Sequence, residues 1–433
     1  MKRNILLFSY SFNRSDHRGV YQYAKSLKNS FDLSEFDINV FTQMYKKDFI
    51  GGGDSIFEYL NNPNDYFLRK GGNKEILLSY FLSGFFLKKN KYFYEFNEKP
   101  DSYRFKGYIN SPIIYYRNNI NLLLPSNDYY VDDISVPFFG KNDLIFTDSP
   151  LSIKSTKHKV VQTVHDLIPI QEKRKFHKYF YKRLKACSYA NKILCVSEYS
   201  KLQYLEYFPA MEGKVEVVYQ PLPADEQTIY LSSLPDVQQE VLDKYNLKSK
   251  QYMYYVGAIE ERKNIHNLIK AYTIATNSDK CCPLVISGNV DDGYSKNYNL
   301  NEYLVSYTDF DKVSHNIMKT DFVSDIEKLV LLRNSRAFLF PSLSEGFGIP
   351  VIEAQTLCVP VMTSNNTSLP EVTNGSALLL ENPLDIEEMV EGIKKLWNDD
   401  HYCSSLILLG NYNSLRFTKE KFKDAIGQFL EKV

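Results

Sequence analysis

Short apolar runs alternate with amphipathic or polar stretches along most of the chain. β-branched and aromatic residues concentrate in these runs, which is typical of buried strands. We expect strands at residues 4–10, 160–164, 192–196, 214–219, 252–256, 284–287, 337–340, 359–363 and 378–380. Helices are expected to begin near residues 19, 197, 264, 350 and 385. This alternation of strand and helix predicts a parallel sheet in each half of the chain.

The middle of the chain contains a boundary between these halves. Pro221 and Pro223 interrupt the pattern, and we interpret the polar stretch over residues 224–250 as a connection plus one helix. The sequence therefore predicts two doubly wound, Rossmann-like α/β domains, at residues 1–222 and 223–414, that face each other across a cleft. Ligands of such sheets bind at the carboxyl ends of the strands.

Composition and net charge exclude some classes of function and favour others. The 433 residues include 52 Lys plus Arg and 52 Asp plus Glu, so the formal net charge is zero and no nucleic-acid partner is expected. The six cysteines form no C-x-x-C pair, which favours reduced thiols in a cytoplasmic protein. The 34 tyrosines suit either a surface that contacts sugars, bases or partners, or a core rich in Tyr.

The strongest candidate for chemistry is the segment PSLSEGFGIPVIEAQ at residues 341–355. A glycine loop follows a predicted strand and leads into a helix at Pro350, so backbone N–H groups would face a phosphate or diphosphate. Glu345 and Glu353 can address different parts of one ligand, because carboxylates accept hydrogen bonds from vicinal hydroxyls. The alternative is structural: a tight glycine turn, with Glu353 in the first helical turn satisfying free N–H groups.

Two other clusters follow predicted strands. Arg262 and Lys263 lie between a strand and a helix start, where cations could neutralise a leaving diphosphate, although a solvated turn is the simpler interpretation. His165 and Asp166 come directly after the apolar run at 160–164. Asp166 either orients the imidazole or caps the next turn, and His165 is either close to a ligand or a structural residue.

Together these segments resemble the retaining glycosyltransferases of the GT-B fold in glycosyltransferase family 4, most closely its mannosyltransferases. The motifs that carry the resemblance are H-D-x-x-P at 165–169, R-K-N at 262–264, E-x7-E at 345–353 and SLPEV at 368–372. The match is dense from about residue 160 to residue 396 and weak over residues 30–140, where members of this family vary with their acceptors.

In the second domain, the resemblance implies a role for each matching residue. Arg262 and Lys263 are expected to hold the diphosphate of a nucleotide sugar, and Glu353 to accept hydrogen bonds from its ribose. Contacts to the transferred sugar are implied for Glu345, together with the amides of the residues that follow it, Gly346, Phe347 and Gly348.

In the first domain, the resemblance implies that His165 lies near the reactive carbon of the sugar or its 6-hydroxyl, with Asp166 beside it. Gly19, at a helix start, is expected to approach the diphosphate. The C-terminal helix at 415–433 is expected to pack back on this domain. The chain departs from the family pattern at Ala258, where an arginine often follows the glycine.

The resemblance implies metal-independent chemistry in which Lys, Arg and helix dipoles stabilise the leaving diphosphate. It favours attack of the acceptor on the same face that the leaving phosphate departs from, with no cofactor beyond the nucleotide sugar. GDP-mannose is the first donor expected, and UDP- or dTDP-sugars are the alternatives. A lipid-linked or oligosaccharide acceptor in the synthesis of O-antigen, capsule or exopolysaccharide is expected. The basic, aromatic segment at 88–94 suggests peripheral contact with the inner face of the membrane, although a buried helix followed by basic residues is the simpler interpretation.

Other enzyme classes have weaker support. Asp309 and Asp311 fit the D-x-D motif of a metal-dependent glycosyltransferase, but no strand is predicted before them. The segment at 53–55 fits a serine-hydrolase motif, but the partner His with its preceding Asp is missing and no G-x-S-x-G elbow occurs. A catalytically inactive scaffold or regulatory protein of the same fold is the alternative outside enzymes.

Overall fold

A computed structural model of the chain describes residues 3–9, 19–31, 35–41, 94–96, 108–110, 131–134, 140–174, 177–276, 282–288, 317–320 and 323–433. The D-x-D motif at 309–311, the segment at 53–55 and residues 88–93 of the basic, aromatic segment lie outside the described residues.

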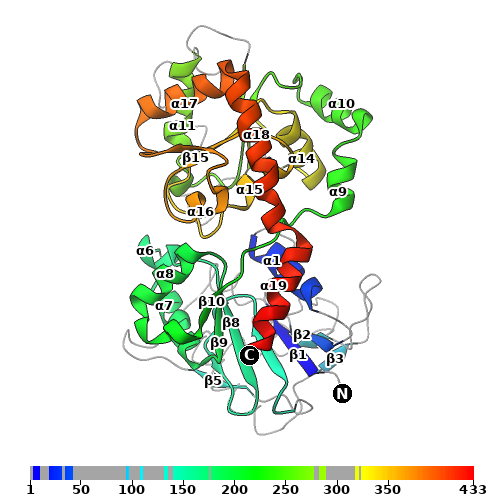
Figure 1. Cartoon of the computed structure of the whole chain (residues 1–433), viewed down its shortest axis with the longest axis vertical. Coiled ribbons are helices and arrows are strands. Elements are labelled where there is room, and N and C mark those ends of the chain that lie inside the picture. The colour runs from blue at the N-terminus through cyan, green and yellow to red at the C-terminus, as the bar shows by residue number, and fades with distance from the viewer. Residues whose placement is uncertain are drawn as a thin grey trace, which may run out of the picture. The chain divides into compact units, whose positions relative to one another are not determined.

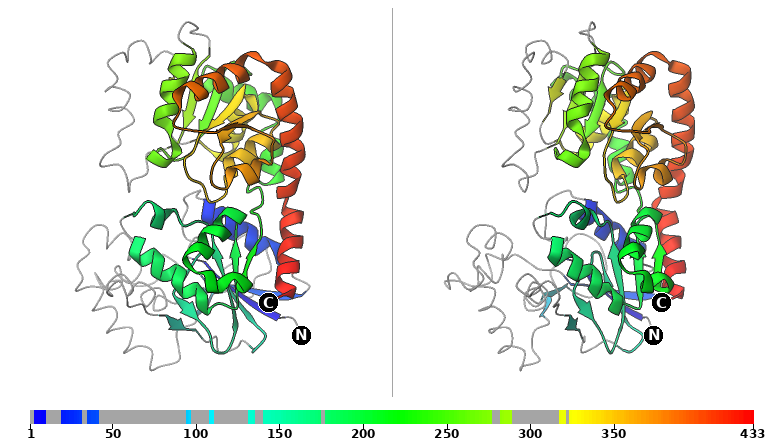
Figure 2. Two further views of the ribbon diagram at one scale, coloured as in Figure 1. Left: turned by 60° about the vertical axis from the view of Figure 1, so that its left-hand side comes forward. Right: turned by 90° about the vertical axis from the view of Figure 1, so that its left-hand side faces the viewer.

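The chain divides into two compact units (Figure 1). Unit 1 comprises Met1–Tyr219 and Lys419–Val433, and unit 2 comprises Gln220–Thr418. Within each unit, helices cover both faces of a sheet (Figure 2). The prediction of two Rossmann-like α/β domains is therefore confirmed at the level of the fold of each unit.

Unit 1 contains an eight-stranded sheet in the order β10-β9-β8-β6-β1-β2-β4-β3. All pairs are parallel except β3 with β4. The strands are β1 (Arg3–Phe8), β2 (Phe36–Phe41), β3 (Tyr94–Phe96), β4 (Tyr108–Asn110), β6 (Leu144–Thr147), β8 (Lys159–Val164), β9 (Lys192–Cys195) and β10 (Val215–Val217). A separate short pair joins β5 (Asp132–Asp133) and β7 (Ile153–Lys154). The helices described are α1 (Gly19–Ser30), α6 (Ile168–Gln171), α7 (His177–Ala186), α8 (Glu198–Tyr207) and α19 (Lys419–Glu431), with 3-10 turns at Cys187–Tyr189 and Pro209–Lys214.

Unit 2 contains a six-stranded parallel sheet in the order β13-β12-β11-β14-β15-β16. Its strands are β11 (Met253–Val256), β12 (Leu284–Ser287), β13 (Ile317–Lys319), β14 (Ala337–Phe340), β15 (Val361–Ser364) and β16 (Leu378–Leu380). Its helices are α9 (Glu226–Leu231), α10 (Pro235–Lys244), α11 (Ile265–Ala275), α14 (Asp325–Asn334), α15 (Ile349–Thr356), α16 (Leu369–Thr373), α17 (Ile386–Asn398) and α18 (Asp400–Ser414), with 3-10 turns at Glu261–Lys263 and Leu415–Phe417. From β11 the chain order runs outward to β13 on one side of the sheet, and from β14 it runs outward to β16 on the other side. The carboxyl ends of β11 and β14, where the order changes, are therefore the expected ligand site of the sheet.

The strand positions follow from burial on both faces. All four residues of β12 and of β14 are buried, as a parallel strand covered by helices on both sides requires. Tyrosines fill much of this core: six of the largest fully buried side chains in the described residues are Tyr23, Tyr204, Tyr252, Tyr254, Tyr255 and Tyr272. Some of their buried hydroxyls have partners: Tyr252 donates to the Leu331 carbonyl at 2.6 Å, and Tyr204 donates to the Leu184 carbonyl at 3.2 Å. A Tyr-rich core thus accounts for part of the unusual composition.

The start of unit 2 differs from the prediction of one helix over residues 224–250. Two helices form, because the Asp225 side chain caps α9 and the segment Ser232–Leu234 ends it. Pro235 then begins α10 at a position where its missing N–H costs nothing.

The C-terminal helix α19 belongs to unit 1 and packs on α1. Phe422 of α19 contacts the ring of Tyr23, with 6.0 Å between ring centroids. Lys432 forms an ion pair with Glu216 at 2.6 Å. The chain therefore returns to its first unit after completing the second, with the change between Thr418 and Lys419.

Candidate functional site

The loop between β14 and α15 is shaped by one glycine with a left-handed backbone. Gly348 has φ of +106° and precedes the first residue of α15, with Pro350 in the first turn. A Cβ on Gly348 would lie 2.8 Å from Leu369 Cδ2, so both the backbone and the packing require glycine here. Ser368 fixes the loop by donating its hydroxyl to the carbonyls of Glu345 and Phe347, each at 3.0 Å.

Glu345 is the centre of a buried charge cluster in this loop. Its Oε1 lies 2.5 Å from Lys263 Nζ and its Oε2 lies 3.3 Å from Arg262 Nη1. The Ser342 hydroxyl donates to the same carboxylate at 2.7 Å. Burial raises the pKa of Glu345, but Lys263 and Arg262 outweigh burial and hold that pKa below its usual range. Glu345 is therefore ionised at neutral pH.

Arg262 and Lys263 come from the turn after β11, beside β14 in the sheet. Arg262 also pairs with Glu260 at 2.5 Å and donates to the Ser344 carbonyl at 2.7 Å. Glu260 and Lys263 are buried, so the interpretation of this segment as a solvated turn is wrong. Two carboxylates and two cations thus balance each other at the point where the strand order reverses.

Glu353 lies in the second turn of α15, not in the first, because the helix begins at Ile349. It is 3% exposed and its Oε1 lies 2.6 Å from Nζ of Lys328 on α14. The alternative role for Glu353, satisfying N–H groups at the helix start, is therefore wrong. The sequence offered no signal for Lys328, which lies 25 residues away on another helix.

His165 of unit 1 follows β8 and is held as a neutral donor. Its Nε2 lies 2.7 Å from the Asp148 carbonyl, which can only accept, so Nε2 carries the proton and Nδ1 of the neutral ring is an acceptor. Burial lowers the pKa of His165 in spite of this hydrogen bond. The Tyr23 ring packs edge-to-face with the imidazole, with 4.7 Å between the ring centroids. The Ser200 hydroxyl donates to the His165 carbonyl at 2.7 Å.

Asp166 and Gly19 occupy different surroundings. The Asp166 carboxylate accepts a hydrogen bond from the Ile168 N–H at 3.0 Å, which is the turn-capping alternative predicted for it. Gly19 is the first residue of α1, and a Cβ there would meet no atom within 4 Å. Packing within the described residues therefore does not require glycine at this position.

The structure brings the predicted residues of unit 2 together more closely than those of unit 1. Arg262, Lys263 and Glu345 form one cluster, and Gly346, Phe347 and Gly348 belong to the same loop. Phe347 is buried and packs edge-on against Phe417, with 5.6 Å between ring centroids. Sequence reasoning missed four residues around these side chains. Lys328 pairs with Glu353, Ser342 donates to Glu345, Ser368 fixes the loop, and Glu260 pairs with Arg262.

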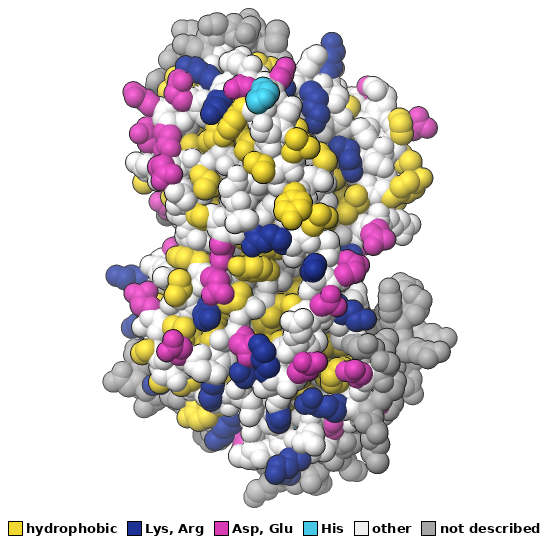
Figure 3. All heavy atoms as spheres, in the orientation of Figure 1, with side chains coloured by type: hydrophobic (Ala, Val, Ile, Leu, Met, Phe, Trp, Pro, Cys, Tyr) yellow, Lys and Arg dark blue, Asp and Glu magenta, His cyan; other side chains and the backbone are white. Residues whose placement is uncertain are grey.

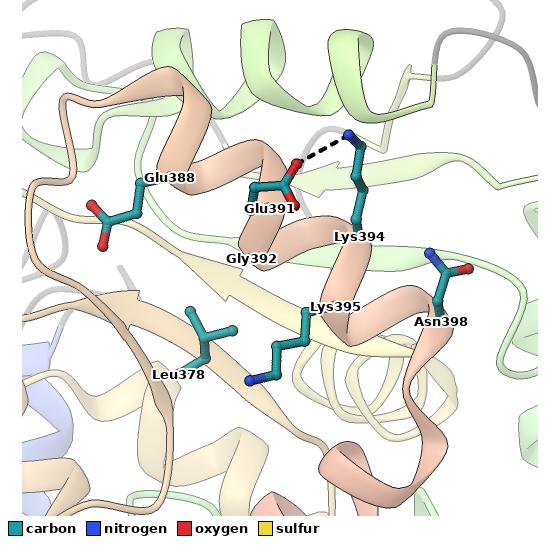
Figure 4. Close-up of a pocket in the computed structure, with 7 residues that line it drawn as sticks. All are labelled: Leu378, Glu388, Glu391, Gly392, Lys394, Lys395 and Asn398. Atoms are coloured by element: carbon teal, nitrogen blue, oxygen red, sulfur yellow. Dashed lines mark hydrogen bonds and ion pairs between the residues drawn. The ribbon is translucent and has the colours of Figure 1, made fainter.

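A shallow pocket elsewhere in unit 2 does not involve this site. It lies between α17 and β16 and is lined by Leu378, Glu388, Glu391, Gly392, Lys394, Lys395 and Asn398 (Figure 4). Glu391 and Lys394 pair within it at 3.1 Å.

On the face drawn in Figure 3, cationic and anionic side chains are interspersed, in line with the zero net charge. Within the described residues, no group of three or more His, Cys, Asp or Glu side chains could hold a metal ion. No helix in this part of the chain is long and apolar enough to cross a bilayer.

Part of unit 2 matches a known protein family. Residues 237–408 match the family model described as Glycosyl transferases group 1. O-antigen chain mannosyltransferase B of Escherichia coli is 29% identical over 284 residues, which cover 64% of this chain and 71% of that protein. Serotype-specific mannosyltransferase WbdA of Escherichia coli is 27% identical over 255 residues, 57% of this chain but only 30% of that protein.

Among solved structures, sucrose-phosphate synthase from Thermosynechococcus elongatus aligns with a TM-score of 0.66 and 16% identity. The alignment covers 100% of this chain and 99% of that one, and it concerns the fold alone. Residues 237–408 lie within unit 2, which also holds the Glu345 cluster. Residues 237–408 therefore carry a Glycosyl transferases group 1 domain, and the fold of the chain is similar to that of the solved sucrose-phosphate synthase.

Proposed function

We propose that this protein transfers mannose from GDP-mannose to a saccharide acceptor in the synthesis of a surface polysaccharide. The observation that carries the proposal is the buried cluster of Glu345, Lys263 and Arg262 at the carboxyl ends of β11 and β14, where the strand order reverses. The relatives named O-antigen chain mannosyltransferase and serotype-specific mannosyltransferase support the choice of mannose.

The cluster suits the diphosphate of a nucleotide sugar. Arg262 and Lys263 are cations in a buried, preorganised setting, where they stabilise the charge that develops on a leaving diphosphate. Amides of Gly346, Phe347 and Gly348 at the start of α15 add partial positive charge. We propose that these groups supply the charge stabilisation without a metal ion, and that Glu345 turns to the hydroxyls of the sugar when phosphate takes its place beside the cations.

The proposed transfer retains the configuration of the sugar. The bond between the anomeric carbon and the phosphate oxygen breaks through an oxocarbenium-like transition state. The acceptor hydroxyl forms the new bond on the same face, and its proton passes to the leaving phosphate. We assign the neutral His165 to the 6-hydroxyl of the sugar, because its Nδ1 is an acceptor when Nε2 donates to the Asp148 carbonyl.

We place the reaction at the inner face of the cell membrane, with a lipid-linked or oligosaccharide acceptor. The support is the similarity to O-antigen mannosyltransferases. UDP- and dTDP-sugars are alternative donors, since no residue of the described part identifies the base. An inactive protein of the same fold is the alternative that predicts no release of nucleotide.

A donor screen tests the proposal. The full chain is incubated with GDP-, UDP- and dTDP-sugars, with and without EDTA and a lipid-linked acceptor, and released nucleoside diphosphate is measured. Release from GDP-mannose that survives EDTA supports the proposal. Release from another donor corrects the donor, and loss of release in EDTA overturns metal independence. No release together with no thermal stabilisation by any donor overturns the proposed function, because an active site that awaits its acceptor still binds the donor.

A further inference from the structure

Lys328 and Glu353 form a buried ion pair that is separate from the Glu345 cluster. The two side chains are 21% and 3% exposed, and the ammonium lies 2.6 Å from Oε1 of the carboxylate. Asp325, on the same helix as Lys328, is 3.9 Å from the ammonium and largely solvated, so the short contact with Glu353 dominates. Within the described residues, Oε2 of Glu353 has no hydrogen-bond partner and remains able to accept.

The lysine projects from a helix that is fixed at both ends. At its N-terminus, Ser324 and Glu327 form a reciprocal capping box. After Lys328, the residues Leu329–Leu332 are all buried in the core of unit 2. Lys328 is therefore held in place by α14 before any ligand binds.

Burial makes the cation necessary for the carboxylate. Burying a carboxylate at 3% exposure costs free energy unless a cation pairs with it. Burial also lowers the pKa of Lys328, but Glu353 outweighs burial and raises that pKa above its usual value. Glu353 thus favours the charged form of Lys328, and the carboxylate oxygens of Glu353 are acceptors for hydroxyl hydrogens.

We propose that Lys328 is a positioning residue that pairs with Glu353 and orients its carboxylate to accept hydrogen bonds from the ribose diol of the donor. It thereby sets the preference of the enzyme for ribonucleotide over deoxyribonucleotide sugars. The inference rests on the proposed function, because it needs a nucleotide donor. Lys328 does not itself contact the donor, and the cations of the diphosphate site belong to the other cluster.

Steady-state kinetics with the preferred donor and its 2′-deoxyribose counterpart test this role. Wild type should favour the ribose donor by about 10–100-fold in kcat/KM, as expected for a lost hydrogen bond to a charged group. Lys328→Met should raise the KM for the ribose donor by about tenfold or more, change kcat by less than about threefold, and reduce the ribose preference to below about threefold. Lys328→Arg should retain most of the preference.

Lys244→Met provides the matched control, because it removes a lysine paired with Glu327 next to Lys328 but is 57% exposed. It should leave both KM and the ribose preference unchanged. If Lys328→Met does not fold, Lys328→Arg and Glu353→Gln replace it, and Glu353→Gln should abolish the preference by itself.

The outcomes separate the two proposals. Wild type that turns over without any ribose preference, or Lys328→Met that keeps the full preference, overturns the role of Lys328 alone. Wild type that neither transfers from nor binds any nucleotide sugar overturns the proposed function, and the role of Lys328 with it.

Discussion

The two units place candidate residues after strands of similar parallel sheets, but they stabilise those residues in opposite ways. In unit 2, Glu345 is buried together with Lys263 and Arg262, so charge is compensated by charge. In unit 1, His165 is buried as a neutral ring, and one backbone carbonyl satisfies its N–H. Burying a charge demands a partner of opposite sign, whereas burying a neutral imidazole demands only a hydrogen bond.

In the proposed transfer, this difference divides the chemistry between the two units. The cluster of unit 2 is already neutral overall, with Glu260 and Glu345 opposite Arg262 and Lys263. An anionic ligand must therefore share the cations with Glu345, which links phosphate binding to a movement of that carboxylate. His165 offers no such charge, so its contribution is limited to hydrogen bonding and proton affinity. The predictions below change either the charge of unit 2 or the neutrality of unit 1.

Glu345→Gln should have the largest effect, because it removes the charge on which the unit 2 cluster depends. We expect kcat/KM to fall by about 10²–10³-fold, the usual cost of losing a preorganised electrostatic contact. The free energy of unfolding should fall by about 3 kcal/mol, because Lys263 stays buried with only one of the two carboxylates of the cluster to balance its charge. Released nucleotide and urea denaturation measure the two effects. Glu391→Gln is the control, because Glu391 is 75% exposed and should change neither. Wild-type turnover in a folded Glu345→Gln variant would contradict the assignment.

Gly348→Ala should have the next largest effect, because it disturbs the loop that carries Glu345. A left-handed alanine costs about 1–2 kcal/mol, and the Cβ would also meet Leu369 at 2.8 Å. Gly375→Ala separates these costs, since Gly375 has φ of +77° but a Cβ there would meet no atom within 4 Å. Urea midpoints should rank wild type above Gly375→Ala, and Gly375→Ala above Gly348→Ala. Equal midpoints for the two variants would mean that the loop does not pack on Leu369.

Much of this comparison could be predicted from the sequence, for a physical reason. Parallel strands buried on both faces are continuous apolar runs, so β12, β14 and β16 lie where the pattern predicted them. The Ser197 cap of α8 was likewise predicted, because a hydroxyl at a helix start has a local partner, here the Ser200 N–H. Features that depend on residues close together in the chain can therefore be predicted from the sequence.

Contacts that depend on strand order could not be predicted from the sequence. Lys263 meets Glu345 because β11 and β14 are adjacent, although 82 residues separate the two side chains. Lys328 had no motif to identify it, because any basic residue on that face of α14 could reach Glu353. The partner of His165 is a backbone carbonyl, which leaves no trace in residue types. The first turn of α15 was misplaced by one residue, which moved Glu353 beyond the capping positions.

The neutrality of His165 predicts how stability depends on pH. Burial lowers its pKa in the folded state below the ordinary 6.5, so the unfolded chain binds more protons between the two values. Stability should be complete above about pH 6.5 and fall as the pH drops below it, by at most about 1.4 kcal/mol per pH unit. His165→Asn, which keeps a donor for the Asp148 carbonyl, should show a shallower decline in urea unfolding between pH 5 and 7. His266, whose pKa burial lowers to about 4, remains in both proteins and cancels in the difference. Identical slopes would show that His165 is not buried as a neutral ring.

Asp166 gives the smallest expected effect and the sharpest test of whether unit 1 uses charge. Its carboxylate accepts from the Ile168 N–H, and an amide oxygen can do the same, so Asp166→Asn should keep stability and transfer within about threefold of wild type. Asp166→Ala loses this acceptor and should cost about 0.5–2 kcal/mol of stability. The comparison is made on initial rates and urea midpoints of both variants. A loss of more than about tenfold in the rate of Asp166→Asn at unchanged stability would mean that a negative charge beside His165 takes part in transfer. The contrast between the two candidate sites would then fail, because the Asp166 carboxylate would act together with the imidazole in transfer.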